Sequence, residues 1–385
     1  METSMNRISI ASFIAAVGLG GWGAVAQAQS VTLYGILDTG VEYINHASAN
    51  GSSVVRVPGN TGELPSRWGL RGVEDLGGGY KAVFTLESGI TVGTGGLGQG
   101  GRLLGRQAFV GIDGPLGLLT FGRQYSMLYR AIFDADFIGP DIYGIASLDA
   151  WIASARSDNT VAYQRHFGPV TFGASYSFGR DASPTGGTNT PGSGTCVGNL
   201  AGNNEACREW SAMLKYDVTA GGVAISYDRQ DGGPGATANF FNGIAPVALA
   251  GSGNRDSRFL LDGYFKLGNF ELGAVWLNRQ VEFTGLGAKN ITSNQYVLEA
   301  SYQVTPAFVV DGLVQKIIDR QQDTRASMEV LRATYFLSAR TAIYAQAALL
   351  QNSTYAAYSV SGGGSSTPGK GMNQFGMMCG VRHSF

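Results

Sequence analysis

The sequence predicts an all-β fold, an antiparallel up-and-down β-barrel of about 16 strands that crosses a membrane. Three observations predict this class. After Val31, runs of about 8–12 residues alternate apolar and polar side chains with the period of a strand. Tight turns rich in Gly, Asn and Pro alternate with long polar connections. The last alternating run ends at Phe385, and a closed barrel can pair such a strand with the first one and leave no open edge.

The composition is consistent with this class. The 385 residues include 58 glycines, and only 14% of the residues are charged, against about a quarter in average soluble domains. The net charge of −1 gives no reason to expect nucleic acid as a partner. The mean hydropathy is close to zero, as expected when each strand shows only every second side chain to lipid.

The N-terminal segment has the pattern of a cleaved export signal. A short basic segment precedes an apolar run of small residues at 8–25, and an Ala-x-Ala cleavage motif follows. We therefore expect a signal peptide over residues 1–28 and a single barrel domain over residues 29–385. Met1 and Met5 both remain candidate starts. A retained membrane anchor would need a longer run without glycines.

The three cysteines suit an exported protein. Cys196 and Cys207 lie in one Gly-, Asn- and Thr-rich segment, where a disulfide bond between them would contribute about 3 kcal/mol. Two free thiols are the alternative. Cys379 lies on the apolar face of the last run, where we expect it to act as a small hydrophobic residue.

The expected connections, taken in chain order, fall into two classes. Tight turns lie at residues 75–79, 113–117, 167–169, 218–222, 267–269, 304–306 and 337–340, and long connections at 46–65, 124–157, 179–206, 231–256, 281–293 and 352–371. Tight turns at one end and long loops at the other are typical of a barrel in a bacterial outer membrane. A water-soluble β-sandwich is the rival, but it would not repeat Lys, Asp and Arg on its inward faces.

The last strand indicates which face meets lipid. Met377, Cys379, Val381, His383 and Phe385 share one largely apolar face, and the alternate positions carry small residues and one arginine. Aromatic residues also fall near strand ends, where two girdles would meet the lipid headgroups: Tyr43, Tyr80, Tyr216, Tyr227, Trp276 and Tyr302.

Five segments of the chain resemble the general diffusion porins of Gram-negative outer membranes. They are residues 30–38, 66–79, 81–89, 106–111 and 380–385. The resemblance implies a 16-stranded homotrimeric barrel in the cell outer membrane, with the third external loop folded into the lumen as a constriction. It also implies contact with outer-membrane lipid and lipopolysaccharide. The barrel-assembly machinery is then expected to recognise the C-terminal strand through Val381, His383 and Phe385.

The connection at 124–157 is the candidate for this loop. It carries Asp134, Asp136, Asp141 and Asp149 among apolar side chains that could pack on the barrel wall while the carboxylates face water. Asp136 and Asp141 are similar to the acidic motif of the family's constriction loop, and Asp134 and Asp149 match it less clearly.

A basic cluster is expected on the opposite wall. Arg67 and Arg71 share one face of their strand, and the resemblance places Arg106 and Arg156 on the same wall. Lys81 should face the lumen outside the narrowest ring. Across roughly 10 Å at an effective dielectric near 20, one such pair interacts by about 1.7 kcal/mol, enough to orient solutes but too little to trap an ion. The alternative is a set of ordinary solvated charges in a wide lumen.

These features predict a porin for passive diffusion of ions and small hydrophilic solutes, weakly selective with a lean to anions, and with no cofactor. A channel selective for phosphate or small organic anions is the main alternative, and a soluble adhesin-like β protein is the third. An enzyme is disfavoured because His46, His166 and His383 stand in no nucleophile–base arrangement.

Overall fold

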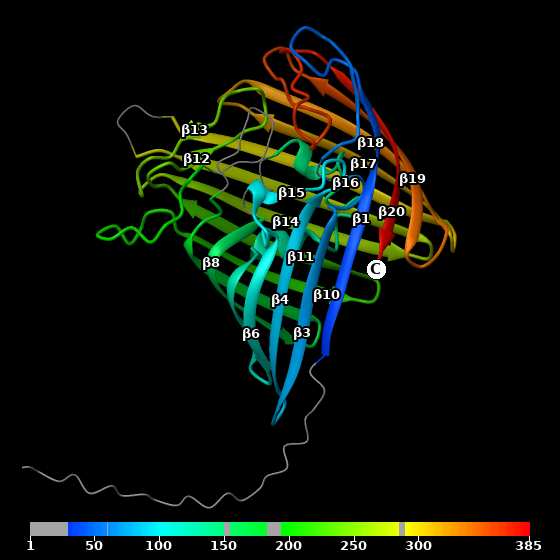
Figure 1. Cartoon of the computed structure of the whole chain (residues 1–385). Helices are drawn as coiled ribbons and strands as arrows, with labels where there is room; N and C mark the ends of the chain where they lie inside the picture. Colours follow the sequence, from blue (N-terminus) through cyan, green and yellow to red (C-terminus); the bar gives the residue numbers. More distant parts are fainter. Residues whose placement is uncertain (1–29, 60, 150–154, 183–193, 285–288) are drawn as a thin grey trace, which may run out of the picture.

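The computed structural model describes residues 30–59, 61–149, 155–182, 194–284 and 289–385. It confirms the predicted class, a closed antiparallel barrel of 16 strands (Figure 1). The predicted signal peptide, residues 1–28, lies outside the described residues. The barrel strands are β1 (Ser30–Ile44), β3 (Arg67–Gly77), β4 (Tyr80–Thr91), β6 (Gln107–Gly114), β7 (Gly117–Tyr125), β8 (Arg156–Phe167), β9 (Val170–Gly179), β10 (Glu209–Val218), β11 (Gly221–Asp231), β14 (Arg255–Leu267), β15 (Phe270–Glu282), β16 (Ile291–Thr305), β17 (Phe308–Asp319), β18 (Thr324–Phe336), β19 (Thr341–Asn352) and β20 (Gln374–Ser384).

The remaining elements belong to the connections. They are β2 (Val54–Arg56) beside β1, β5 (Gly96–Leu97) beside β4, the hairpin of β12 (Thr237–Ala238) and β13 (Val247–Ala248), the helix α1 (Met127–Ile132), and the 3-10 turns η1 (Gln99–Gly101) and η2 (Ile145–Ser147). In the described part of the chain, no helix is long and apolar enough to cross a membrane.

The first and last strands close the barrel. β20 pairs with β19 on one side and with β1 on the other, where His383 lies opposite Leu37. Gly35 and Phe385 exchange two backbone hydrogen bonds of 3.0 Å each. A Cβ atom at Gly35 would lie 2.3 Å from the Phe385 ring, so the closing pair requires glycine at this position. The terminal phenylalanine thus packs over the seam between the two ends of the chain.

The strands alternate between a lipid face and a lumen face, as predicted. On β18, Leu331 is 61% exposed and its neighbour Arg332 only 7%. Large apolar side chains point outward on the other barrel strands too, whereas buried carboxylates, arginines and amides recur on the inward positions. This polar interior is incompatible with the dry core of a β-sandwich.

Tight turns join the strands at one end of the barrel and long loops at the other (Figure 1). One external connection, residues 320–323, is as short as the turns at the opposite end. Cys196 and Cys207 form the expected disulfide bond, with their Cα atoms 5.5 Å apart, and the bridge packs in a small hydrophobic cluster with Phe240. Cys379 is a free, exposed thiol on β20.

Candidate pore constriction

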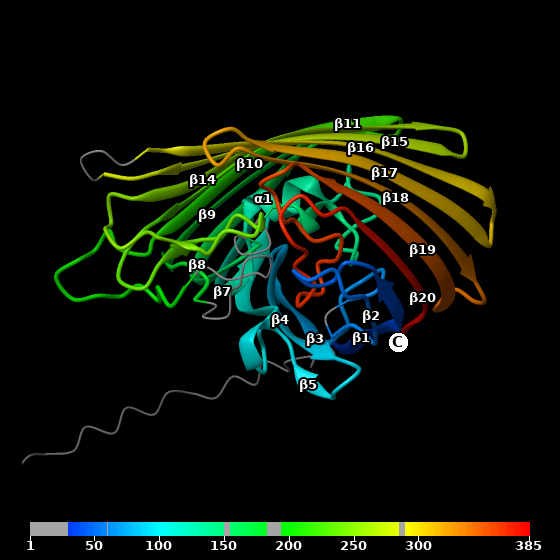
Figure 2. The ribbon, with the colours of Figure 1, turned by 90° about the horizontal axis from the view of Figure 1, so that it is seen from above.

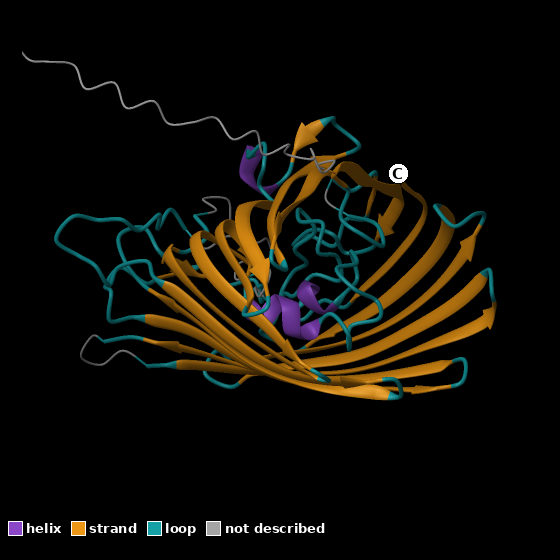
Figure 3. Ribbon diagram, turned by 90° about the horizontal axis from the view of Figure 1, so that it is seen from below, coloured by secondary structure: helices purple, strands orange, loops and turns teal. Residues whose placement is uncertain are grey.

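The connection between β7 and β8 folds into the barrel, which confirms the inward fold expected of the third external loop (Figures 2 and 3). It begins with α1, whose preceding residue Ser126 accepts a hydrogen bond from the backbone N–H of Tyr129 at 3.3 Å. The backbone N–H of Met127 donates to Ser211 Oγ on β10 at 2.8 Å. These two contacts turn the chain inward immediately after β7.

Side chains from the far wall hold the loop backbone. The Glu299 Oε2 atom on β16 accepts hydrogen bonds from the N–H groups of Phe137 and Ile138, at 2.7 and 3.0 Å. The Arg332 guanidinium on β18 donates to the carbonyl oxygens of the same two residues, at 3.1 and 2.8 Å. The loop therefore lies along the wall with its polar backbone groups satisfied.

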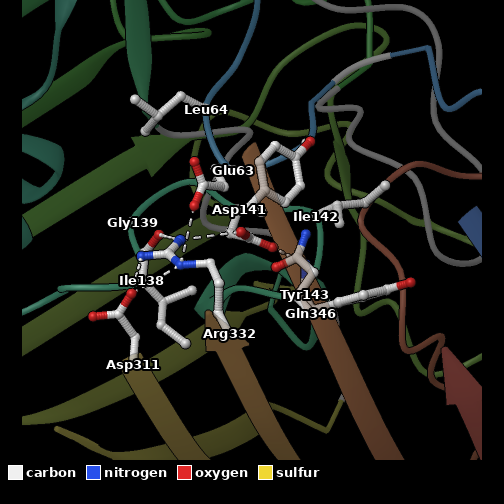
Figure 4. A network of polar contacts seen from close by, with 12 residues as sticks. Glu63, Leu64, Ile138, Gly139, Asp141, Ile142, Tyr143, Asp311, Arg332 and Gln346 are labelled. Atoms are coloured by element: carbon white, nitrogen blue, oxygen red, sulfur yellow. Dashed lines mark hydrogen bonds and ion pairs between the residues drawn. The ribbon is translucent and has the colours of Figure 1, made fainter. Parts of the chain in front are cut away.

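Asp141 joins the loop to the barrel wall (Figure 4). It accepts a hydrogen bond from the backbone N–H of Tyr143 at 2.8 Å and pairs with Arg332 at 3.1 Å. Arg332 also pairs with Asp311 at 2.8 Å and lies 3.6 Å from Glu63. One arginine thus faces three carboxylates, and the network joins the loop to β17 and β18.

The other three loop aspartates also have partners of their own. Asp149 pairs with Arg258 on β14 at 3.2 Å, Asp134 pairs with Lys215 on β10, and Asp136 accepts from the N–H of Gly139 at 2.7 Å. The barrel wall behind the loop therefore supplies cations for Asp134, Asp141 and Asp149, and the loop backbone itself holds Asp136.

The expectation that these carboxylates face water is wrong for three of them. Asp136 is buried within the loop, where it accepts a hydrogen bond from the Gly139 N–H. Asp141 is 4% exposed and Asp149 is 2% exposed, because wall arginines draw both into buried ion pairs. Burial raises the pKa of Asp136 to about 6. Burial likewise raises the pKa of Asp141 to about 7, although Arg332 acts in the opposite direction. Both groups thus titrate within the physiological range.

Three of the predicted arginines converge at the other side of the lumen. Arg106 pairs with Glu87 at 2.7 Å and donates to the Tyr125 hydroxyl at 2.7 Å. Arg156 donates to the same hydroxyl at 3.3 Å and lies 4.7 Å from the centre of that ring, and Arg67 lies 3.7 Å from Glu87. We call Arg67, Arg106 and Arg156 the arginine cluster. Glu87 is the carboxylate that pairs with two of its members, so the cluster keeps an excess of positive charge.

Arg71 and Lys81 lie apart from the arginine cluster. Arg71 is four residues from Arg67 along β3, roughly 13 Å away, and stacks 5.5 Å from the centre of the Tyr34 ring. Lys81 is exposed near the short-turn end, opposite Asp75 and Asp113 in the strand register. No hydrogen bond or ion pair links either side chain to the described residues of the loop.

Two members of the arginine cluster, Arg106 and Arg156, meet the loop at one small cavity. Arg106, Arg156, Tyr129, Asp141 and Ser147 are among the residues that line this space of about 50 Å³. On the short-turn side of the loop a larger cavity of about 770 Å³ opens, lined in part by Arg332 and Asp311. The inward loop thus separates the small cavity, which we call the gap, from the larger cavity on the short-turn side.

The last long connection also enters the lumen (Figure 2). Residues 356–361 are buried. The Gly362 N–H donates to the Ile142 carbonyl of the third loop at 2.7 Å, and the Ala357 N–H donates to the Asn242 carbonyl at 2.9 Å. Three long loops therefore meet above the cavity.

Sequence reasoning missed the wall residues that neutralise the loop. Arg332, Arg258, Lys215 and Glu299 all lie on inward positions of late strands, where strict alternation marks them as luminal. The alternation of inward and outward positions could therefore have identified these four residues as luminal. Among the described residues, no group of His, Cys, Asp and Glu side chains is placed to hold a metal ion.

A closed barrel with an outward apolar face and a charged, loop-narrowed lumen defines an outer-membrane channel. The chain belongs to the Gram-negative porin family. The sequence model of that family matches residues 11–355. Family and fold are those of non-enzymatic channels, and they place the protein in the outer membrane.

Individual relatives extend over almost the whole chain. An outer membrane porin protein of Bordetella pertussis is 32% identical over 89% of this chain and 94% of its own length. Outer membrane porin protein 32 of Delftia acidovorans is 30% identical over 97% of this chain and 99% of its own. Among solved structures, an anion-selective porin from Comamonas acidovorans superposes with a TM-score of 0.74 at 25% identity, over 93% of this chain and 100% of that one.

Proposed function

We propose that this porin is a general diffusion channel for ions and small hydrophilic solutes that passes anions in preference to cations. Its constriction is formed by the arginine cluster on one side and the third loop on the other. One observation carries the proposal. Arg67 and Arg106 share one carboxylate, Glu87, and Arg156 beside them binds the Tyr125 hydroxyl, whereas the four loop aspartates are held by contacts of their own. The local excess of positive charge favours anions at the gap.

The solved relative described as anion-selective supports this direction of selectivity. The proton affinity of the loop supports it too, because a buried Asp141 with a pKa of about 7 is partly neutral at physiological pH. The roles of Arg71, Lys81, Asp134, Asp136 and Asp149 are secondary in this proposal, since none of them lines the narrow gap.

The test is planar-bilayer conductance of the purified protein with a reversal potential in a KCl gradient. We expect three equal current steps and a conductance that rises linearly with salt concentration. The reversal potential should have the sign that indicates preferred permeation of anions. Arg156→Ser should move that potential toward cations, because it removes one of two cations at the gap. The matched control is Arg71→Ser, about 13 Å from Arg67 along the strand, which should move it less. A cation-selective wild type, or equal shifts in both variants, would refute the proposal.

A phosphate- or organic-anion-selective channel is favoured by one observation. Arg156 is buried, and its Nε atom has no hydrogen-bond partner among the described residues although the side chain lines the gap. Such a group can hold one oxyanion. Block of the chloride current by micromolar phosphate would select this second function over general diffusion.

The oligomer and the cellular partners complete the proposal. We infer a homotrimer after cleavage of residues 1–28, with lipopolysaccharide around the barrel. The assembly machinery would recognise Val381 and His383 on β20 and Phe385 directly after it, and Val381 and Phe385 are exposed large apolar side chains. Three current steps per insertion would support the trimer, and single steps would contradict it.

A further inference from the structure

The inward loop presents one large aromatic side chain to the water of the lumen. Phe133, which follows α1 directly, is 49% exposed, and within residues 126–149 it is the one exposed large apolar side chain. The helix α1 lies inside the barrel (Figure 3), so the exposed surface of Phe133 faces the lumen. An apolar group that covers this surface gains free energy, because it removes the ring from water.

Two buried tyrosines support the Phe133 ring. Tyr125 and Tyr129 stack with their ring centres 4.4 Å apart and an interplanar angle of 12°. Phe133 meets them edge-on, 4.8 Å from the Tyr129 ring centre and 6.4 Å from the Tyr125 ring centre. Tyr129 and Phe133 are four residues apart, so one helical turn fixes their spacing. We call Tyr125, Tyr129 and Phe133 the aromatic step.

The aromatic step also contacts the arginine cluster. The Arg156 guanidinium lies 4.7 Å from the centre of the Tyr125 ring and 5.9 Å from the centre of the Tyr129 ring. Its Nε atom is buried and has no hydrogen-bond partner among the described residues. An unused guanidinium donor and an exposed ring therefore both lie close to the Tyr125 ring, within reach of one small solute.

The gap beside the aromatic step has a lining of mixed character. Its cations are Arg106 and Arg156, and its carbon-rich surfaces come from Pro65, Tyr129, Pro140, Ala146 and Ala155. A phosphate ion would use only the cations. A carboxylate attached to an aromatic ring would use both kinds of surface, because guanidinium groups bind carboxylates through charge-assisted hydrogen bonds and aromatic rings pack favourably edge to face.

We propose that the aromatic step and Arg156 together form a transit site for small aromatic monocarboxylates, of which benzoate is the simplest. The carboxylate binds the Arg156 guanidinium, and the ring of the solute packs against Phe133 and Tyr129. This inference rests on the anion preference proposed above and adds a preference among anions. The contacts are few and remain open to water, so the solute is concentrated at the gap without being held there.

The test compares three monovalent anions in planar bilayers that contain the purified porin. Benzoate, cyclohexanecarboxylate and acetate are each placed opposite chloride as potassium salts at neutral pH, where all three are ionised. The reversal potential gives the permeability of each anion relative to chloride. Cyclohexanecarboxylate matches benzoate in charge and approximate size and lacks the aromatic ring. We expect benzoate to permeate about threefold better than cyclohexanecarboxylate, a factor within the range of one aromatic pair.

Variants of Phe133 test the ring directly. Phe133→Leu keeps an apolar side chain and should abolish the preference for benzoate over cyclohexanecarboxylate, whereas Phe133→Tyr keeps a ring and should retain it. Neither variant changes a charge, so the reversal potential in a KCl gradient should stay that of wild type. The matched control is Tyr355→Leu, which removes an exposed aromatic residue of the last long loop that does not line the gap, and it should keep the preference. Wild-type conductance in KCl shows that each variant is folded.

The outcomes separate this inference from the proposed function. Equal permeability of benzoate and cyclohexanecarboxylate in wild type, with anion selectivity in KCl, would overturn the transit site and leave the proposed function standing. An unchanged preference in Phe133→Leu, or the same loss in Tyr355→Leu, would also overturn it. A cation-selective reversal potential in KCl would refute the proposed function itself.

Discussion

Replacing Arg332 with methionine removes a buried cation that binds both the third loop and the barrel wall. The side chain pairs with Asp141 and Asp311 and donates to the carbonyl oxygens of Phe137 and Ile138. The substitution leaves two carboxylates and two carbonyl groups without this donor. Loss of one partner of a buried ion pair typically costs about 3–5 kcal/mol, because the other charge stays buried and unpaired. We expect a loss of that size in the free energy of unfolding.

The assay is urea unfolding in detergent micelles, with tryptophan fluorescence and gel migration as independent probes. The control is Arg255→Gln, which breaks an exposed pair 3.9 Å from Glu282 and should cost less than about 1 kcal/mol. Current noise in Arg332→Met should rise as well, since the loop loses an anchor to β18. A stability loss equal to that of the control would refute the reasoning that Arg332 fixes the loop.

Three further predictions follow from other contacts. Because burial raises the pKa of Asp141 to about 7, its contribution to the packed loop is present at low pH and is lost as pH rises through that value. Wild type should therefore lose stability relative to Asp141→Asn between about pH 4 and pH 7 in urea unfolding. A constant difference over this range would contradict the shifted pKa. Gly35→Val should block closure of the barrel against Phe385, seen as loss of the heat-modifiable band on gels, and normal assembly would show that the seam tolerates a side chain. Cys196→Ser/Cys207→Ser should lower stability by about 3 kcal/mol with conductance retained, as measured by urea unfolding under non-reducing conditions; no change would show that the bridge does not restrict the unfolded chain.

The fold was predictable from the sequence because it depends on local rules. Period-two alternation identifies the two faces of each strand, and turn chemistry identifies where strands reverse. The terminal Phe385 signalled closure, and the structure shows the reason in its packing over Gly35. Parity and resemblance also placed Arg67 and Arg106 on the luminal wall.

The partners of the loop were not predictable in the same way. Asp141 and Arg332 are 191 residues apart, and their contact depends on the stagger between strands and on the path of the loop through the lumen. Neither the strand stagger nor the path of the loop can be deduced from the local sequence pattern of either segment. Burial of Asp141 and Asp149 followed from these distant partners, so the expectation of open, water-facing carboxylates failed there.

The wall-held loop has a consequence for the order of assembly. Phe137 and Ile138 bind Glu299 on β16 and Arg332 on β18, strands that are synthesised long after the loop itself. A barrel that closed with this loop outside would leave Glu299 and Arg332 without the loop backbone groups that they bind. Loop insertion and sheet closure should therefore occur in one cooperative step of high contact order, and the slow phase of folding should include both.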